Sequence, residues 1–328
     1  FDMKDRLLFA YKNTNREGKN VFDLNMQKNP YLSIRGNVPI TYKINFIDRD
    51  TGMVHYSNEV SVGGWVACGI DYYVNWRIEA INVETEEIEF EYEQDFTNKN
   101  IFIWFDSVAL GDTLAWLPVV EEFRKKHNCK MYCSTFWNDL ISESYPEITF
   151  IIPESGFEDF VSSYRIGFFE ASLQSPVDMK EVSLQGLCAG ILGIKDYKEI
   201  KCEIKVKETE TELEKPYVCI GMQSTAQAKY WNYPGGWDKV VDFLSKKGYN
   251  VVCIDKFQSF GQGEYFNVAP KKVIGRHERT IDQTIATLNG AEFFIGLGSG
   301  LSWLAWTLNK YVIMISGFSN PGSEFSSK

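Results

Sequence analysis

The sequence predicts an α/β protein whose two Rossmann-like halves face each other across a cleft, preceded by an antiparallel β module. Three observations lead to this fold class. Polar and apolar residues alternate through residues 1–97, solid apolar runs alternate with helical patterns from residue 101, and the second pattern restarts at residue 217. Strands that alternate with helices form parallel, doubly wound sheets. The predicted domains are 1–97, 100–207 and 215–328, and we expect the last to be truncated at its C-terminus.

The β module is predicted to be a small antiparallel barrel or sandwich. Residues 38–48, 53–60, 71–79 and 88–92 alternate in polarity, and residues 49–52 (Arg-Asp-Thr-Gly) mark a hairpin turn between the first two runs. Period-two patterns bounded by Gly, Asn and Asp are typical of strands. Residues 97–100 are then expected to be the exit linker.

Each Rossmann-like half is predicted from buried strands followed by helices. In the first half, strands are expected at 101–105, 129–134 and 150–153, with a helix that starts at Leu110. Residues 208–216 are charged and are expected to form a linker. In the second half we expect strands at 217–221, 249–255, 292–297 and 311–316, and helices at 235–247, 280–288 and 300–308. Ligands bind such sheets at the carboxyl ends of the strands.

Charge and composition exclude several classes of protein. The 328 residues carry a net charge of −10, and the sequence pI is about 5.0. This argues against general nucleic-acid binding and against docking on anionic membranes through a basic patch. No apolar run reaches the ~18 residues of a membrane span, and we expect no N-terminal signal segment.

The cysteines and histidines do not predict a metal site. Seven cysteines are scattered along the chain, only Cys129 and Cys133 lie close together, and the three histidines form no cluster. The spacings do not match known zinc patterns. We therefore expect buried thiols in a reducing cytoplasm.

The first motif that could carry chemistry spans Ser107–Arg124. A strand ends in a small-residue turn with Gly111, and Asp112 lies at the start of the helix. Asp112 could act as a general base that deprotonates an acceptor hydroxyl. The alternative is that it only caps the helix.

The second motif, Gln223–Asn232, follows the first strand of the second half. Its hydroxyls, amides and single lysine suit a diphosphate, and Lys229 would neutralise charge on a leaving group. The alternative is an exposed loop lysine, because no Walker-type glycine pattern is present. The candidate donor-binding residues of this motif are Ser224, Thr225, Gln227 and Trp231.

The third motif is a Gly/Ser turn between a strand and a helix at 295–306. Backbone N–H groups at such a helix start could cradle a phosphate, or the glycines could serve only close packing. Asp255 and Glu324 are further candidates for ribose or sugar contacts, with plain loop residues as the alternative. The candidate donor-binding residues here are Gly298, Ser299, Gly300, Leu301, Ser302, Trp303 and Asp255.

The first and third motifs resemble the heptosyltransferase family of GT-B glycosyltransferases. That family has a Leu-Gly-Asp turn before a helix with Leu-Pro-x-x-x-x-Leu-Arg, and here the sequence has Leu110-Gly-Asp and Leu117-Pro-Val-Val-Glu-Glu-Phe-Arg. The family's Asp-Thr-Gly-Leu-Ser-His turn is Gly298-Ser-Gly-Leu-Ser-Trp303 in this chain. Three long runs are more similar to the bacterial autotransporter protein O-heptosyltransferases, namely 217–232, 294–306 and 315–325.

This resemblance implies an activity and its residues. Asp112 matches the proposed catalytic base, and Lys229 matches the lysine that holds the donor phosphates. It implies ADP-heptose as donor, serine hydroxyls of an autotransporter (adhesin) passenger as acceptor, and a large ring-like homo-oligomer. It also implies a structural iron held by a cysteine-rich C-terminal segment, which does not occur within residues 1–328, and no cofactor is needed for the chemistry.

Two alternative functions stay open on the sequence alone. One is a GT-B glycosyltransferase that uses another nucleotide sugar or another acceptor. The other is a non-catalytic protein that binds sugar nucleotides or assembles other proteins through the β module. Acceptor-dependent release of ADP would separate an enzyme from a binder.

Overall fold

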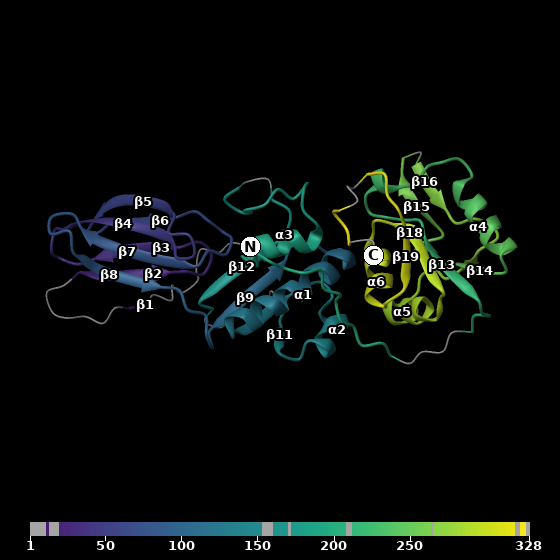
Figure 1. Ribbon diagram of the computed structural model, residues 1–328, viewed down its shortest axis with the longest axis horizontal. Coiled ribbons are helices and arrows are strands. Elements are labelled where there is room, and N and C mark those ends of the chain that lie inside the picture. The colour runs from purple at the N-terminus through teal and green to yellow at the C-terminus, as the bar shows by residue number, and fades with distance from the viewer. Residues whose placement is uncertain are drawn as a thin grey trace.

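Three β-rich parts follow one another along the long axis of the molecule (Figure 1). The computed structural model describes residues 11–12, 20–152, 160–169, 172–207, 212–263, 265–318 and 322–325. Antiparallel sheets form the N-terminal part, and two parallel sheets with helices form the rest. The predicted α/β architecture with an antiparallel N-terminal module is therefore confirmed, while the exact domain bounds stay predictions.

The N-terminal part consists of two packed antiparallel sheets. Alternate residues of the strands are buried, as the period-two pattern predicts, and both sheets contribute to one apolar core that includes Leu32, Ile44 and Phe46. The first sheet has the order β1-β2-β3-β6 and the second β5-β4-β7-β8. The strands are β1 (Tyr11–Lys12), β2 (Val21–Asn25), β3 (Tyr31–Arg35), β4 (Thr41–Asp48), β5 (Val54–Ser61), β6 (Trp65–Ala67), β7 (Trp76–Asn82) and β8 (Ile88–Glu93).

The first parallel sheet has the order β11-β10-β9-β12. Its strands are β9 (Asn100–Phe105), β10 (Lys130–Ser134), β11 (Ile148–Phe150) and β12 (Ser162–Ile166), and its helices are α1 (Leu110–His127), α2 (Asn138–Ile141) and α3 (Leu184–Ile191), with a 3-10 turn at Ser142–Ser144. The strand expected at 150–153 ends at Phe150, and Pro153 lies outside the described residues. We did not predict β12 or α3.

The second parallel sheet has the order β17-β14-β13-β18-β19. Its strands are β13 (Tyr217–Gly221), β14 (Asn250–Cys253), β17 (Ile274–Gly275), β18 (Phe293–Leu297) and β19 (Tyr311–Ile315), and its helices are α4 (Gly236–Lys246), α5 (Ile281–Gly290) and α6 (Gly300–Thr307). A 3-10 turn at Gln227–Lys229 follows β13. After β14 the chain forms a hairpin that we did not predict, with strands β15 (Ser259–Gln262) and β16 (Tyr265–Val268). Within the expected linker at 208–216, residues 208–211 lie outside the described residues.

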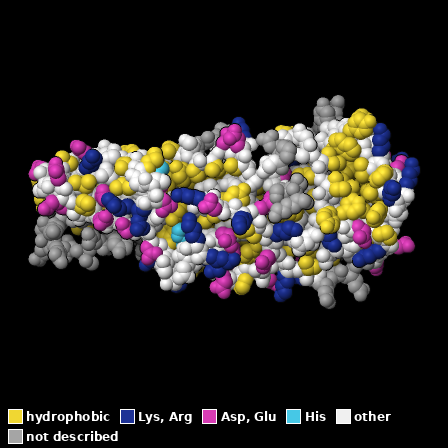
Figure 2. Space-filling model, viewed as in Figure 1, with side chains coloured by type: hydrophobic (Ala, Val, Ile, Leu, Met, Phe, Trp, Pro, Cys, Tyr) yellow, Lys and Arg dark blue, Asp and Glu magenta, His cyan; other side chains and the backbone are white. Residues whose placement is uncertain are grey.

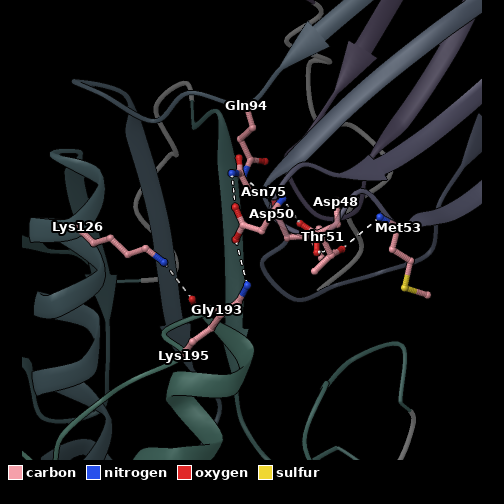
Figure 3. Close-up of polar contacts among 10 residues, drawn as sticks. Asp48, Asp50, Thr51, Met53, Asn75, Gln94, Lys126, Gly193 and Lys195 are labelled. Carbon is pink, nitrogen blue, oxygen red and sulfur yellow. Dashed lines mark hydrogen bonds and ion pairs between the residues drawn. The ribbon is translucent and has the colours of Figure 1, made fainter.

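Polar contacts join the β module to the first parallel sheet (Figure 3). The Asp50 carboxylate accepts a hydrogen bond from Asn75 at 2.8 Å and pairs with the Lys195 ammonium at 3.3 Å. The Asn75 bond, and then Lys195, lower the pKa of Asp50. Within the first half, the Lys126 ammonium of α1 donates to the Gly193 carbonyl at 3.0 Å, two residues before Lys195. A cavity of about 680 Å³ lies beside this junction, between the β4–β5 turn and α3.

The strand that we expected at 71–79 starts only at Trp76. The preceding residues leave the β module and bond to the first half instead. The Asp71 amide donates to the Leu173 carbonyl at 2.9 Å, and the Tyr73 amide donates to the Ile191 carbonyl at 2.8 Å. The alternating pattern of these residues therefore serves a contact between two parts of the chain rather than one sheet.

Helices α1 and α6 bring the two parallel sheets together by their N-terminal ends. An added Cβ on Gly300 would lie 3.1 Å from the Gly111 nitrogen, and one on Gly111 would lie 3.1 Å from the Trp303 ring. Glycine at both positions is what allows two backbones to approach so closely. Asp112 thus lies next to the Gly/Ser turn of the second half.

The outer surface carries an apolar patch over the second half. Figure 2 shows hydrophobic side chains gathered where β15 and β16 lie in Figure 1. Phe266 and Val268 of β16 are 55% and 58% exposed. Patches of this kind mark interaction surfaces. Of the helices that the structure describes, none has the length and apolar character needed to cross a membrane.

Candidate active site

Asp112 is held by a hydroxyl rather than by the helix terminus. It lies in the first turn of α1, whose N-cap is Ala109. The Ser107 hydroxyl donates to the Asp112 carboxylate at 2.5 Å and accepts a hydrogen bond from the Ala109 amide at 3.2 Å. The alternative role as an N-cap does not describe this geometry, because the cap position is three residues earlier.

The pKa of Asp112 is raised from its ordinary value, above all by burial. The Ser107 hydrogen bond and the charge of Lys229 oppose this shift, whereas the charges of Glu324 and Asp106 add to it. A carboxylate with a raised pKa is a better proton acceptor than one in water, and the Ser107 hydroxyl and the Lys229 charge both favour its ionised form.

Lys229 reaches the same place from the second half. It ends the 3-10 turn after β13, and its ammonium donates to the Gly298 carbonyl at 2.8 Å. A carboxylate oxygen of Glu324 lies 3.7 Å from the Lys229 nitrogen, and the other oxygen accepts the Trp303 indole N–H at 2.7 Å. The Glu324 side chain is 8% exposed and that of Lys229 is 27% exposed, so the lysine keeps a surface that faces solvent.

The N-terminus of α6 offers hydrogen-bond donors beside this lysine. Ser299 is the N-cap residue in an extended conformation, and its side chain makes no cap bond. Among the described residues, the Ser299 hydroxyl is buried without a hydrogen-bond partner. A helix N-terminus with an unused hydroxyl favours phosphate oxygens. Gly300 and Leu301, the next two residues, start the helix.

Several predicted site residues make internal contacts that shape the site. Both oxygens of Asp255 accept backbone amides, from Met222 at 2.7 Å and from Gln223 at 3.1 Å, so this buried carboxylate fixes the loop after β13. The Ser302 hydroxyl donates to the Leu297 carbonyl at 2.6 Å and ties the start of α6 to β18. Direct donor contacts by these two side chains stay predictions.

The loop after β13 carries the remaining predicted residues. Thr225 is exposed, and Ser224 and Gln227 are half-buried. Trp231 packs on an aromatic cluster, with its ring 6.0 Å from the Tyr233 ring and 5.5 Å from the Trp237 ring. The structure therefore brings Asp112, Lys229 and the Gly298–Trp303 turn together, with the loop hydroxyls one turn away from Lys229 along the chain.

Two parts of the site were not assigned from the sequence. Ser107 was part of the first motif, but nothing in its local sequence signalled a bond to Asp112. The sequence predicts only ribose or sugar contacts for Glu324, whereas its bond to Trp303 and its pairing with Lys229 come from the fold. Long-range pairs of this kind leave no periodic signal in a sequence.

Known proteins resemble this chain in sequence and in fold. The family model described as "Glycosyltransferase family 9 (heptosyltransferase)" matches residues 194–324. The chain is 37% identical to the autotransporter heptosyltransferase Aah of Escherichia coli over 298 residues, which cover 87% of this chain and 73% of Aah. It is also 32% identical to BimC of Burkholderia thailandensis, which is described as inactive. That match covers 72% of this chain and 57% of BimC.

The solved structures include an even more complete match. TibC from enterotoxigenic E. coli H10407, described as an iron-containing dodecameric glycosyltransferase, superposes with a TM-score of 0.86 at 30% identity, covering 97% of this chain and 83% of that one. A second TibC structure, in complex with ADP-D-beta-D-heptose, superposes with a TM-score of 0.85 at 31% identity, covering 93% of this chain and 80% of that one.

Two parallel sheets joined through α1 and α6 therefore define a glycosyltransferase of the GT-B class, with an added antiparallel β module. The match to Aah covers more than two thirds of both chains. The chain belongs to the autotransporter heptosyltransferase family.

Proposed function

We propose that this protein transfers heptose from ADP-heptose to serine hydroxyls of an autotransporter passenger, with inversion at the anomeric carbon. The observation that carries the mechanism is the convergence of Asp112 from the first half with Lys229 from the second half. TibC, whose structure holds ADP-heptose, supports the donor, and Aah, described as an autotransporter heptosyltransferase, supports an autotransporter as acceptor. Serine as the modified residue is what the family resemblance implies.

Asp112 is the general base of the proposed reaction. Its carboxylate takes the proton of the serine hydroxyl while the serine oxygen forms a bond to the anomeric carbon. The bond from that carbon to the diphosphate breaks on the opposite face, and its electron pair leaves with ADP. Attack from the face opposite the leaving group inverts the configuration. General-base catalysis of this kind contributes typically 10²–10⁴-fold.

The second half stabilises the departing diphosphate. The Lys229 ammonium and the N-terminus of α6 with its buried Ser299 hydroxyl provide positive charge and donors. Ser224 and Thr225 add hydroxyls from the loop after β13. Asp255, Ser302 and Trp303 position these elements through the hydrogen bonds described above, and Gly298 holds Lys229 through its carbonyl.

Two substitutions with matched controls test the assigned roles. Asp112→Asn should lower kcat by 10²–10⁴-fold and leave the Kd for ADP unchanged, because only the proton acceptor is lost. Lys229→Ala should weaken ADP binding as well as turnover. The controls Asp242→Asn and Lys239→Ala change the same residue types on the exposed side of α4. Wild-type turnover in Asp112→Asn would refute the mechanism.

Calorimetric titration with ADP-heptose, ADP, UDP and GDP tests the donor. We expect binding of the two adenine ligands and its loss in Lys229→Ala. If only UDP or GDP binds, the proposed reaction type still stands, but the donor is a UDP-sugar or a GDP-sugar instead of ADP-heptose.

A non-catalytic binding protein is the second candidate function, because BimC, an inactive relative, is 32% identical to this chain. ADP release that depends on a passenger acceptor would exclude it. Retention of ADP-heptose without any turnover, with or without acceptor, would establish it.

We further propose that the chain acts in the cytoplasm and as a homo-oligomer. All seven cysteines are free, which suits a reducing compartment. The apolar patch over β15 and β16 (Figure 2) suits self-association, and TibC is a dodecamer. TibC is also described as iron-containing, but the residues that the structure describes do not fit an iron site, because no three His, Cys, Asp or Glu side chains gather there.

A further inference from the structure

Exposed apolar side chains line the carboxyl edge of the first parallel sheet. One of them follows each of the four strands in the loop beyond its end, and their exposed fractions lie between 47% and 67%. Because the strand order is β11-β10-β9-β12, the four loops lie side by side and the residues form a row. In spatial order the row consists of Ile152, Phe136, Val108 and Phe168.

Two of the loops that carry this row are joined by a hydrogen bond, and a third contacts helix α1. The Trp137 indole N–H, next to Phe136, donates to the Val108 carbonyl at 3.1 Å. The Phe168 ring lies 5.8 Å from the Trp116 ring of α1. Exposed apolar residues scattered singly are ordinary on a protein surface, but a row of them along one edge of a sheet marks an interaction surface.

The row passes directly beside the proposed base. Val108 is the neighbour of Ser107, whose hydroxyl donates to Asp112 at 2.5 Å. A molecule that presents a hydroxyl to Asp112 from the side of the first sheet must therefore lie along these loops. The donor phosphates are held by the opposite half, at Lys229 and α6.

We propose that this row is the surface on which the acceptor polypeptide lies, and that it selects serines with apolar neighbours. The inference rests on the proposed function and adds what recognises the acceptor. Strands are ~4.8 Å apart, so four of them span ~14 Å, which matches about four residues of an extended chain at ~3.3 Å each.

Charge at this edge favours a polypeptide over an anionic lipid. A cation of this edge, Arg165, already pairs with the Asp106 carboxylate at 2.8 Å, and Asp112 adds a second carboxylate. A lipid headgroup with phosphates would meet these acidic groups, whereas apolar side chains of a polypeptide would bury the exposed row.

The test uses the double variant Val108→Thr/Phe136→Ser and a passenger fragment that the wild-type enzyme glycosylates. Both native side chains are more than 60% exposed, so the fold is retained, which a thermal melt checks. We expect the KM for the passenger to rise at least tenfold, with kcat at saturating passenger and the Kd for ADP unchanged. The control Phe243→Ser replaces a side chain that is 60% exposed on α4 and should change none of these.

A second measurement changes the acceptor. Replacing the apolar neighbours of a glycosylated serine by asparagine should raise the KM for the wild-type enzyme but not further for the double variant. An unchanged passenger KM in the double variant would overturn the inference while leaving the proposed function intact. Binding of the wild type to vesicles of anionic phospholipid, lost in the double variant, would show a membrane surface instead. A wild-type enzyme that modifies no passenger would count against the proposed function itself.

Discussion

Replacing Ser107 by alanine should change the pH dependence of transfer. The Ser107 hydroxyl donates to the Asp112 carboxylate at 2.5 Å and is one of the influences that hold down a pKa raised by burial. Alanine removes this donor and leaves the carboxylate in place. The pKa of Asp112 should therefore rise further above its ordinary value.

The size of the change follows from the hydrogen bond. A bond to a charged group contributes about 1.5–3 kcal/mol, and each pKa unit corresponds to about 1.36 kcal/mol. The lower end of this range corresponds to a rise of about 1 unit in the pKa of Asp112. Asp112 acts as a base when ionised, so activity is lost as the pH falls through this pKa.

The assay is the pH profile of kcat/KM for heptose transfer in the wild type, Ser107→Ala and the control Ser245→Ala, which changes an exposed serine of α4. The acid limb of Ser107→Ala should lie about 1 pH unit higher, with a tenfold loss well below it and wild-type rates well above it. A limb at the wild-type pH, or an equal loss at every pH, would refute the positioning role of Ser107.

Three further predictions concern the surroundings of the site. Glu324→Gln removes a charge that raises the pKa of Asp112 and pairs with Lys229. The acid limb of the pH profile of this variant should therefore lie at lower pH, and ADP should bind several-fold more tightly. Calorimetry that finds no gain in ADP affinity would contradict this. Gly300→Ala places a Cβ 3.1 Å from the backbone nitrogen of Gly111 and should cost about 1–3 kcal/mol of unfolding free energy in a denaturant titration; an unchanged value would mean that the two helices adjust freely. Burial, with the Lys126 charge, lowers the pKa of His127 to about 4. As the pH is lowered from 6.5 to 4, the unfolded chain therefore takes up a proton that the folded chain does not, and the free energy of unfolding should fall. His127→Phe should abolish this part of the loss, and a melting temperature that drops as much as in the wild type would disprove the assignment.

Local sequence patterns were sufficient for most of the regular elements. Solid apolar runs and helical periodicity indicated β9, α1, β13, α4 and β18 within a few residues of their observed bounds. The same patterns placed Asp112 and Lys229 just beyond strands whose carboxyl ends bear ligands in such folds. Long shared motifs then identified the family, which periodicity cannot do.

Elements stabilised by distant contacts could not be predicted from local patterns. The α3 sequence Leu-Gln-Gly-Leu-Cys-Ala-Gly-Ile contains two glycines, which weaken a helix by about 1 kcal/mol each. It is helical because it packs against α1, where the Trp116 indole N–H donates to the Leu184 carbonyl at 3.0 Å. Local propensity could not reveal a contact made 68 residues away in sequence.

For the same reason, only part of the active site could be predicted from the sequence. The residue types at Asp112, Lys229 and Ser299 could be chosen from motifs, because each lies in a turn whose local geometry follows from its own strand and helix. Their mutual arrangement could not, since it depends on the approach of Gly111 and Gly300 and on Glu324 reaching both Trp303 and Lys229. Burial and charge–charge distance, which set the pKa of Asp112, exist only after the chain has folded.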